Sequence, residues 1–332
     1  MKKVVICLMT VLMCLGLCAC GDSKAERSFF AMDTYITVTA YGKNGEKAVQ
    51  AAQELMEGYD ALWSIGEENS VVSRLNRGER ISLDRDTSAL LDRSLEISHM
   101  TQGTFDPLML PVMELWGFTD KHYAVPSEDD IKKALSLTDV QGLHLENGTA
   151  YLTPEGCKAD LGGIAKGYAS GAAADMMREM GVSSGILSLG GNIRTIGEKP
   201  DGSPWRVAVR MPFDEGFIGI VEVRDKAVIT SGGYERYFEE NGKLYHHIID
   251  PKTGCPADSG LMSVTVVSGD DTLADALSTA LFVMGKEQAE EFWWEHEGFD
   301  LILLCDDGSL YITEGIKDDF ISDMEYEVIS DR

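Results

Sequence analysis

Residues 230–254 read TSGGYERYFEENGKLYHHIIDPKTG, and this stretch decides how the rest of the chain is interpreted. Two short alternating runs flank Asn241 and Gly242, a dipeptide that tolerates positive φ at both centres of a tight turn. The stretch therefore predicts a β-hairpin. The sequence DPKTG at residues 250–254 predicts a turn directly after it, because Pro fixes φ while Asp and Gly suit the flanking positions.

The second strand of this hairpin carries a histidine in a notable place. Side chains alternate along a strand, so Tyr245, His247 and Ile249 should share one face. A histidine at the end of a strand, beside a polar turn, can titrate near neutral pH and act as a general base. The same position also suits a purely structural histidine, so the residue alone leaves both roles open.

The composition of the 332 residues is that of an ordinary globular protein, large enough for one big domain or two. The formal net charge is −26, which argues against a nucleic acid partner because phosphate binding needs clustered Lys and Arg. An acidic protein repels anions in general. A phosphate ester substrate would therefore need local positive charge or a metal ion.

The N-terminus predicts export. Two lysines precede an uncharged apolar run at residues 4–19, which is too short to span a membrane comfortably and suits a signal peptide over 1–19. The run ends in LCACG, which resembles a bacterial lipobox with Cys20 as the lipidated residue. We expect a tether at 20–27, one domain at 28–332, and lipid anchoring outside the cytoplasmic membrane. A plain signal peptide or an uncleaved anchor is the alternative.

The cysteines of the expected mature chain do not indicate a disulfide framework. After the signal peptide and Cys20 are set aside, Cys157, Cys255 and Cys305 remain, and no CxxC spacing exists among them. Neither a disulfide scaffold nor a zinc site is indicated. Buried thiols are expected, with a single bridge left open.

The order of expected elements predicts an α+β fold with a mostly antiparallel sheet, since strands come in hairpins and helices in blocks. Periodicity predicts helices near 48–62 and 87–100 and a small-residue helix from about 172 to 180. Strands are expected at 28–41, 205–211, 217–223, 227–230 and 261–268, with further hairpins turning at Asn147-Gly148 and Asp307-Gly308.

Three further stretches could carry chemistry. DLGGIAKGY at residues 160–168 fails the P-loop spacing, yet glycines at a helix start let a ligand approach the backbone, and Lys166 adds charge there. Tight helix packing would explain the glycines equally well. Asp106 precedes a proline, where it can form a turn or contact a ligand. SLGGN at 188–192 predicts a bulge or a backbone cradle.

The sequence DDTLADALSTALFVMG predicts a helix capped by Thr272. Asp275 and Thr279 lie one turn apart at i and i+4, with Ser278 beside them. Oxygen ligands in this arrangement suit a hard cation such as Mg²⁺, usually completed by substrate phosphates and water. Asp275 also fits the acidic position of a capping box, so the pattern alone does not decide.

Together these stretches resemble the ApbE family of flavin transferases over nearly the whole expected mature chain. The resemblance rests on the order of eight motifs, which read AMDT, SVVSRLN, GTFDP with LWGF, DLGGIAKGY, SLGGN, ITSGGYERYF, YHHIIDPKTGCP and ADALSTALFVMG. It implies a T-fold-like α+β domain, Mg²⁺ dependence and FAD as the substrate. It also implies transfer of FMN to a Thr or Ser hydroxyl of an acceptor flavoprotein, with release of AMP.

The resemblance also implies roles for single residues. Asp275 and Thr279 would bind the metal with Ser278 beside them, Gly163 would offer its carbonyl, and His247 would be the base. Contacts to FAD would come from Met32, Thr104, Phe105, Asp106, Asp160, Lys166 and Ile249.

Two positions depart from the family pattern. Asp33 stands where the family usually has Gly, and Gly66 where it often has an aromatic that packs on the flavin nucleotide. Two other functions remain open at this point. One is an FAD pyrophosphatase that uses water instead of an acceptor, and the other is a non-catalytic FAD-binding lipoprotein.

Overall fold

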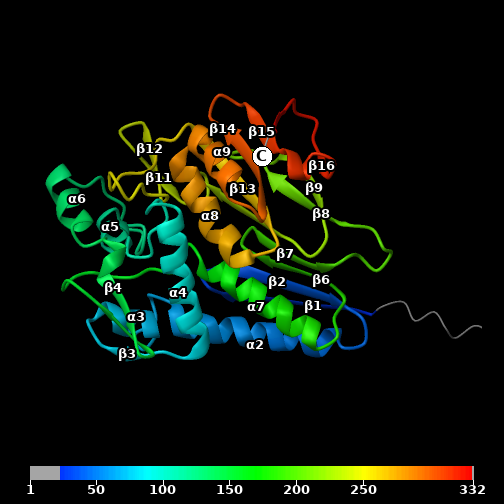
Figure 1. The fold of residues 1–332 in the computed structure, drawn as a ribbon, viewed down its shortest axis with the longest axis horizontal. Coiled ribbons are helices and arrows are strands. Elements are labelled where there is room, and N and C mark those ends of the chain that lie inside the picture. Colours follow the sequence, from blue (N-terminus) through cyan, green and yellow to red (C-terminus); the bar gives the residue numbers. More distant parts are fainter. Residues whose placement is uncertain (1–22, 331–332) are drawn as a thin grey trace, which may run out of the picture.

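The computed structural model describes residues 23–330, which form an α+β fold around a nine-stranded sheet (Figure 1). All neighbouring strands are antiparallel except the last two, which run parallel. The expected fold class is therefore confirmed. In spatial order the strands are β1 (Lys24–Ala31), β2 (Thr34–Tyr41), β6 (Ser184–Leu189), β7 (Asn192–Gly197), β10 (Ala227–Gly232), β13 (Leu261–Ser268), β14 (Phe299–Cys305), β15 (Leu310–Thr313) and β17 (Glu327–Ile329).

The sheet begins earlier than the sequence suggested. Residues 24–27 belong to β1, where Lys24 pairs with Tyr41, whereas we expected them in a tether over 20–27. Ala25 is buried against the helices while its neighbours are exposed, and three charged residues among these four conceal the strand pattern. The expected signal peptide and Cys20 lie outside the described residues.

Four helices cover one face of the sheet: α2 (Gly45–Trp63), α7 (Ala165–Glu179), α8 (Asp271–Met284) and α9 (Lys286–Glu295). The cap of α8 is not the expected Thr272. Asp270 caps the helix by accepting the Leu273 N–H, so α8 begins one residue earlier than Thr272. None of the helices within residues 23–330 is long and apolar enough to cross a membrane.

A small sheet of β8 (Trp205–Arg210), β9 (Phe217–Val223) and β16 (Phe320–Ile321) packs on the opposite face. Its alternating strands bury Trp205, Val207 and Val209 against the central strands. The protein is thus built from helices, a central sheet and a smaller sheet. The cysteines expected to be free are free, with Cys157 and Cys305 buried and Cys255 partly exposed.

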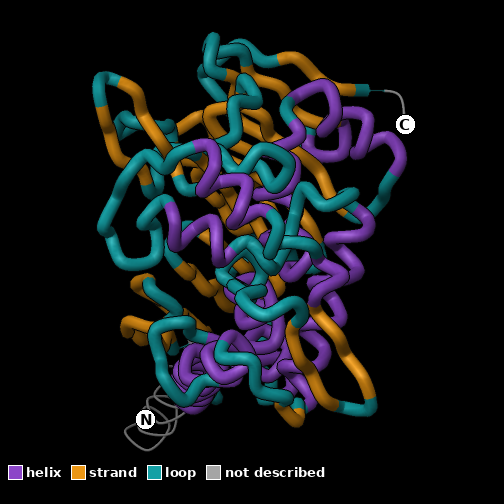
Figure 2. The backbone as a smooth tube through the Cα atoms, turned by 90° about the vertical axis from the view of Figure 1, so that its left-hand side faces the viewer, coloured by secondary structure: helices purple, strands orange, loops and turns teal. Residues whose placement is uncertain are grey.

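The segment between α2 and α7 covers one end of the central sheet and appears in front when that side is viewed (Figure 2). Its helix α6 is capped by Ser127, whose side chain accepts the Asp130 N–H. The segment consists of α3 (Val71–Asn76), β3 (Ile81–Ser82), α4 (Arg85–Met100), α5 (Leu110–Leu115), α6 (Glu128–Leu135), a 3₁₀ turn at Val140–Gly142, β4 (Leu143–Glu146) and β5 (Thr149–Leu152). A second 3₁₀ turn, Glu314–Ile316, lies outside this segment, between β15 and β16.

The predicted hairpin is present as β11 (Tyr237–Glu240) and β12 (Lys243–His246), and it joins no other strand of the described residues. A two-stranded hairpin is marginal by itself. Here an aromatic stack supports it. The ring centroid of Phe238 lies 5.1 Å from that of Tyr123 and 5.2 Å from that of Tyr245. The Tyr245 ring in turn lies 5.5 Å from the Trp116 ring, centroid to centroid. The Trp116 indole also donates to the Gly254 carbonyl, so the stack fixes both the hairpin and the turn after it.

Helices α7 and α8 come closest at Gly167. A Cβ on this residue would overlap the Asp271 carbonyl and lie 2.6 Å from the Asp275 Cβ. The Gly167 N–H donates to the Asp275 carboxylate at 2.8 Å, so the absence of a side chain brings an α8 acid to the start of α7. Gly171, one turn further along, has only ordinary 3.5 Å contacts.

This contact predicts opposite effects of the same substitution at two glycines. Gly167→Ala should lower the free energy of unfolding by about 1–3 kcal/mol, because overpacking outweighs the better helix propensity of Ala. Gly171→Ala is the matched control and should leave stability unchanged or raise it by up to about 1 kcal/mol. Urea unfolding measures both. Equal stabilities for the two variants would show that α7 and α8 are not in close contact.

Candidate active site

A cleft of about 770 Å³ opens at the end of the central sheet, where several turns meet the start of α7 and the end of α2. This volume is typical of small-molecule sites. Its walls come from the β1–β2 turn (residues 32–34), the end of α2 and the loop after it (Tyr59, Asp60 and 63–65), the start of α7 (160–162, Ala165 and Lys166), the β6–β7 turn (190–191 and Ile193), β8 and its following loop (Ala208, Arg210 and Phe213), and Thr230 with the β10–β11 loop (234–237).

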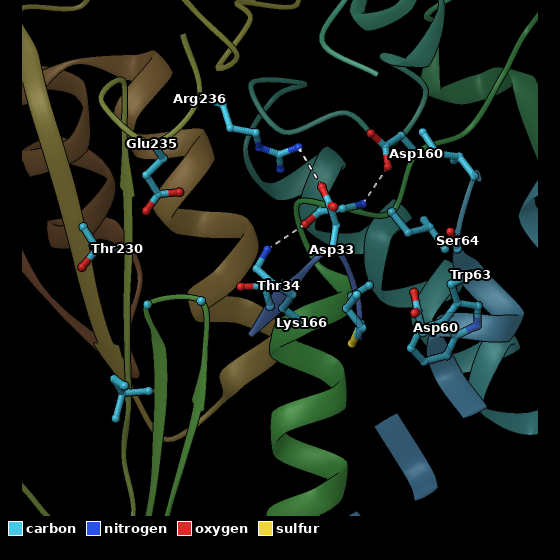
Figure 3. Close-up of a pocket in the computed structure, with 18 of the residues that line it drawn as sticks. Asp33, Thr34, Asp60, Trp63, Ser64, Asp160, Lys166, Thr230, Glu235 and Arg236 are labelled. Atoms are coloured by element: carbon cyan, nitrogen blue, oxygen red, sulfur yellow. Dashed lines mark hydrogen bonds and ion pairs between the residues drawn. The ribbon is translucent and has the colours of Figure 1, made fainter. Parts of the chain in front are cut away.

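Lys166 lies on the floor of this cleft and is held by the turn before its helix (Figure 3). The Asp160 carboxylate accepts the Gly162 N–H at 2.9 Å and shapes the turn. Lys166 Nζ then donates to the Gly162 carbonyl at 3.0 Å and lies 3.9 Å from Asp275 Oδ1. Oxygen atoms from the turn before α7 and from α8 therefore lie near one positive charge.

Asp275 is buried, with 4% of its surface exposed, and its carboxylate has fixed donors. Oδ2 accepts the Gly167 N–H and Oδ1 accepts the Asn192 side-chain amide, both at 2.8 Å. An ionised carboxylate has about four acceptor positions, so these bonds and Lys166 leave room for one further partner. The acid is thus held in one orientation beneath the cleft.

The two hydroxyls of α8 differ in their availability. Ser278 is fully buried, donates to the Asp275 carbonyl at 2.8 Å and lies 2.7 Å from Ser231 Oγ. Thr279 is less buried, and its only hydroxyl contact within residues 23–330 is a 3.3 Å approach to Ser231. Of the two, Thr279 is the more open to a ligand.

This set of atoms fits a hard cation. Carboxylate, hydroxyl and carbonyl oxygens are what Mg²⁺ prefers. The structure places the Asp275 carboxylate and the Gly162 carbonyl near the Lys166 ammonium, and the Thr279 hydroxyl one helical turn after Asp275. Within residues 23–330 no group of three or more His, Cys, Asp or Glu side chains is placed to hold a metal ion. A cation here would therefore depend on one carboxylate, with waters and substrate oxygens completing its coordination.

His247 follows β12 directly, and its ring is oriented by the β10–β11 loop. Its Nδ1 lies 3.2 Å from the Arg236 carbonyl. A carbonyl only accepts, so Nδ1 carries the proton and Nε2 keeps its lone pair. Burial, aided by the charges of Arg236 and Lys166, lowers the pKa of His247 to about 3. The imidazole is therefore neutral at physiological pH and can accept a proton.

The other expected ligand contacts divide into two groups. Met32 lines the cleft together with Asp160 and Lys166. Thr104, Phe105, Asp106 and Ile249 are not among the residues that line it.

The loop with Thr104, Phe105 and Asp106 packs behind the turn that precedes α7. Phe105 approaches the Cβ position of Gly163 to 3.4 Å, and burial raises the pKa of Asp106 to about 7. The Asp160 N–H donates to the Pro107 carbonyl at 2.8 Å. In this structure the loop supports the cleft from behind.

Of the two departures from the family pattern, Asp33 lines the cleft and Gly66 directly follows a lining residue, Ile65. Asp33 pairs with Arg236 at 3.8 Å across the opening, and Figure 3 shows these side chains facing each other. Gly66 brings no aromatic side chain to this region, but Trp63 lines the cleft and stacks on Tyr59 with the ring centroids 4.3 Å apart. An aromatic surface is therefore supplied from the end of α2.

The sequence did not predict a role for several residues that lie at the cleft or bind Asp275 beneath it. Asn192 ends the SLGGN motif and donates to the Asp275 carboxylate. We interpreted only the two glycines of this motif, and they did not predict that contact. Glu235 faces Lys166, and burial raises its pKa despite that neighbouring charge. Arg210 lies at the end of an ordinary strand, where no motif marks it.

Comparison with known proteins agrees with this fold. The family model described as "ApbE family" matches residues 32–303. An FAD:protein FMN transferase of Treponema pallidum (strain Nichols) is 33% identical, with 93% of each chain covered. One from Klebsiella pneumoniae (strain 342) is also 33% identical, over 76% of this chain and 80% of that protein.

Solved structures agree as well. The ApbE protein of Thermotoga maritima MSB8 superposes with a TM-score of 0.84 at 33% identity, covering 90% of this chain and 99% of its own. The flavin transferase ApbE of Vibrio cholerae gives 0.81 at 27% identity, with the same coverage. The fold is thus that of the flavin transferases, a class of α+β protein. The chain belongs to the ApbE family.

The lowered pKa of His247 predicts a specific pH dependence of stability. The pKa of His247 is about 3 in the folded chain and 6.5 when unperturbed, so the unfolded state binds the extra proton between these values. Stability should therefore fall as the pH is lowered through this window, by up to about 1.4 kcal/mol per pH unit. Urea unfolding should show a smaller loss from pH 7 to pH 4 in His247→Gln than in the unaltered chain. Parallel pH profiles would contradict the low pKa.

Proposed function

We propose that this chain transfers FMN from FAD to a Thr or Ser hydroxyl of an acceptor flavoprotein, with Mg²⁺ and with release of AMP. Membership of the ApbE family and relatives named FAD:protein FMN transferase support this function. The observation that carries it is the arrangement of three groups: Lys166 of the cleft lies 3.9 Å from the buried Asp275, and the backbone of Arg236, another cleft residue, holds a neutral His247.

In the proposed reaction the acceptor oxygen attacks the phosphorus on the FMN side of the pyrophosphate. A new oxygen–phosphorus bond forms, the bond to the bridging oxygen breaks, and AMP leaves with that oxygen. The hydroxyl proton passes to Nε2 of His247, which is the unprotonated ring nitrogen. Positioning and charge neutralisation provide most of the catalysis in such a transfer.

Charge neutralisation is a particular need of this protein. Its net charge of −26 repels a pyrophosphate, so local cations must hold the substrate. Lys166 supplies one such charge on the floor of the cleft. Asp275, Thr279 and the Gly163 carbonyl would hold Mg²⁺, with Ser278 supporting them through the Asp275 carbonyl. When bound, the ion would offset charge on the phosphate oxygens.

One assay separates the proposed transferase from the two alternatives. The chain from Lys24 onward is incubated with FAD, Mg²⁺ and a purified FMN-binding domain, and then acceptor mass and free AMP are measured. Acceptor mass gain by one FMN with matching AMP is expected. AMP without mass gain would indicate a pyrophosphatase, and neither product would indicate a binding protein, so either result would overturn the proposal.

In the same assay His247→Ala should slow transfer by about 10²–10⁴-fold, which is the usual loss when a general base is removed. FAD affinity should change little, because the ring does not line the cleft. Quenching of flavin fluorescence measures that affinity. Transfer at the unaltered rate would remove His247 from the role of base.

We further infer that the protein is lipid-anchored outside the cytoplasmic membrane through Cys20, based on the lipobox-like LCACG sequence. A diacylated cysteine carries enough buried hydrocarbon for stable anchoring. Cys20→Ala should therefore move the chain from the detergent-soluble membrane fraction to the aqueous fraction, whereas Cys157→Ala should not. Mass spectrometry of the N-terminal peptide gives a second readout. An unlipidated Cys20 would contradict the inference.

A further inference from the structure

Four exposed aromatic side chains stand around the opening of the cleft, and we call them the aromatic rim: Phe30, Tyr35, Phe213 and Tyr237. Their exposed fractions are 60%, 76%, 59% and 43%, which is unusual for such large apolar groups. Exposed apolar residues scattered singly need no explanation, but a contiguous group indicates an interaction site.

Two ring pairs and an ion pair connect the two sides of the opening. Phe30 and Tyr35 are directly opposed across β1 and β2, with ring centroids 5.7 Å apart, and they flank the turn that lines the cleft. On the other side of the opening, the ring centroids of Phe213 and Tyr237 lie 5.6 Å apart. Between the two pairs the Asp33–Arg236 ion pair, at 3.8 Å, joins the β1–β2 turn to the β10–β11 loop.

Phe213 has a second unusual feature. Its φ is +57°, a region that bulky side chains rarely adopt and that Gly or Asn would occupy with less strain. Because the Phe213 ring is also exposed, burial of its apolar surface does not offset this backbone strain. Such strain is typical of functional surfaces.

The composition of this surface favours a protein partner. Aromatic residues and Arg are the types most enriched in the energetically important centres of protein interfaces. A lipid surface would have to desolvate the Asp33–Arg236 pair at the centre of the rim, which is costly. A second copy of this chain seated here would cover the cleft and exclude its substrate.

We propose that the aromatic rim is the surface on which the acceptor protein docks to present its hydroxyl to the cleft. This inference rests on the proposed transferase function, since only such a partner must both cover the opening and insert a side chain into it. Phe30 and Tyr35 contribute contact area without lining the cleft, so they affect acceptor binding and leave FAD binding alone.

The test uses Phe30→Thr/Tyr35→Thr, which keeps strand propensity on exposed positions. The matched control is Ile321→Thr, an exposed strand residue on β16 of the small sheet, 49% exposed. FMN transfer is measured over a range of concentrations of a purified FMN-binding domain. Fluorescence titration gives the affinity for FAD, and sedimentation gives the oligomeric state.

Loss of two aromatic contacts should raise the acceptor KM by at least about tenfold, since truncating an interface hot spot typically costs that much. The kcat at saturating acceptor, the FAD affinity and all values for Ile321→Thr should stay unchanged. Transfer with an unchanged acceptor KM would overturn the docking inference alone. So would a change of oligomeric state without a change of KM. Absence of transfer by the unaltered chain would overturn the proposed function and the docking inference with it.

Discussion

The hydrogen bond from the Gly167 N–H to the Asp275 carboxylate is the interaction on which the site depends. It forms because Gly167 lacks a side chain and lets α7 approach α8. The contact places a buried acid beside the first turn of α7, next to Lys166 and the Gly162 carbonyl. Asn192 from the sheet completes its donors, so one carboxylate ties both helices and β7 to the floor of the cleft.

Electrostatics then determine what the cleft can do. An acidic chain of net charge −26 has gathered Lys166, Arg210 and Arg236 around one opening. These cations attract a phosphate-bearing substrate. Desolvation of His247, aided by the charges of Arg236 and Lys166, disfavours the protonated imidazole and lowers its pKa. A site that binds anions thus maintains a neutral base beside them, which is the combination that transfer to a hydroxyl needs.

Local chemistry in the sequence predicted much of the fold. The hairpins at Asn147-Gly148, Asn241-Gly242 and Asp307-Gly308 form as expected because their turns require residues that tolerate positive φ. The start of β1 was missed because its charged residues conceal the strand pattern. The Asp270 cap of α8 was missed because Thr272, two residues later, is also a residue type that caps helices.

The site was predicted in part, through the motif order. Lys166, Asp160 and Met32 reach the cleft, and Asp275 lies beneath it. The Asp33–Arg236 pair and Arg210 could not be predicted, because they depend on which loops meet across the sheet. Turn chemistry specifies local conformation, whereas such contacts between distant segments need the assembled fold.

Cation binding by Asp275 is the central claim, and Mn²⁺ titration followed by electron paramagnetic resonance tests it most directly. With FAD present, the chain from Lys24 onward should bind Mn²⁺ in place of Mg²⁺, and Asp275→Asn should weaken that binding at least about tenfold. Circular dichroism controls for folding of the variant. Equal Mn²⁺ affinity in the folded Asp275→Asn chain would contradict the account.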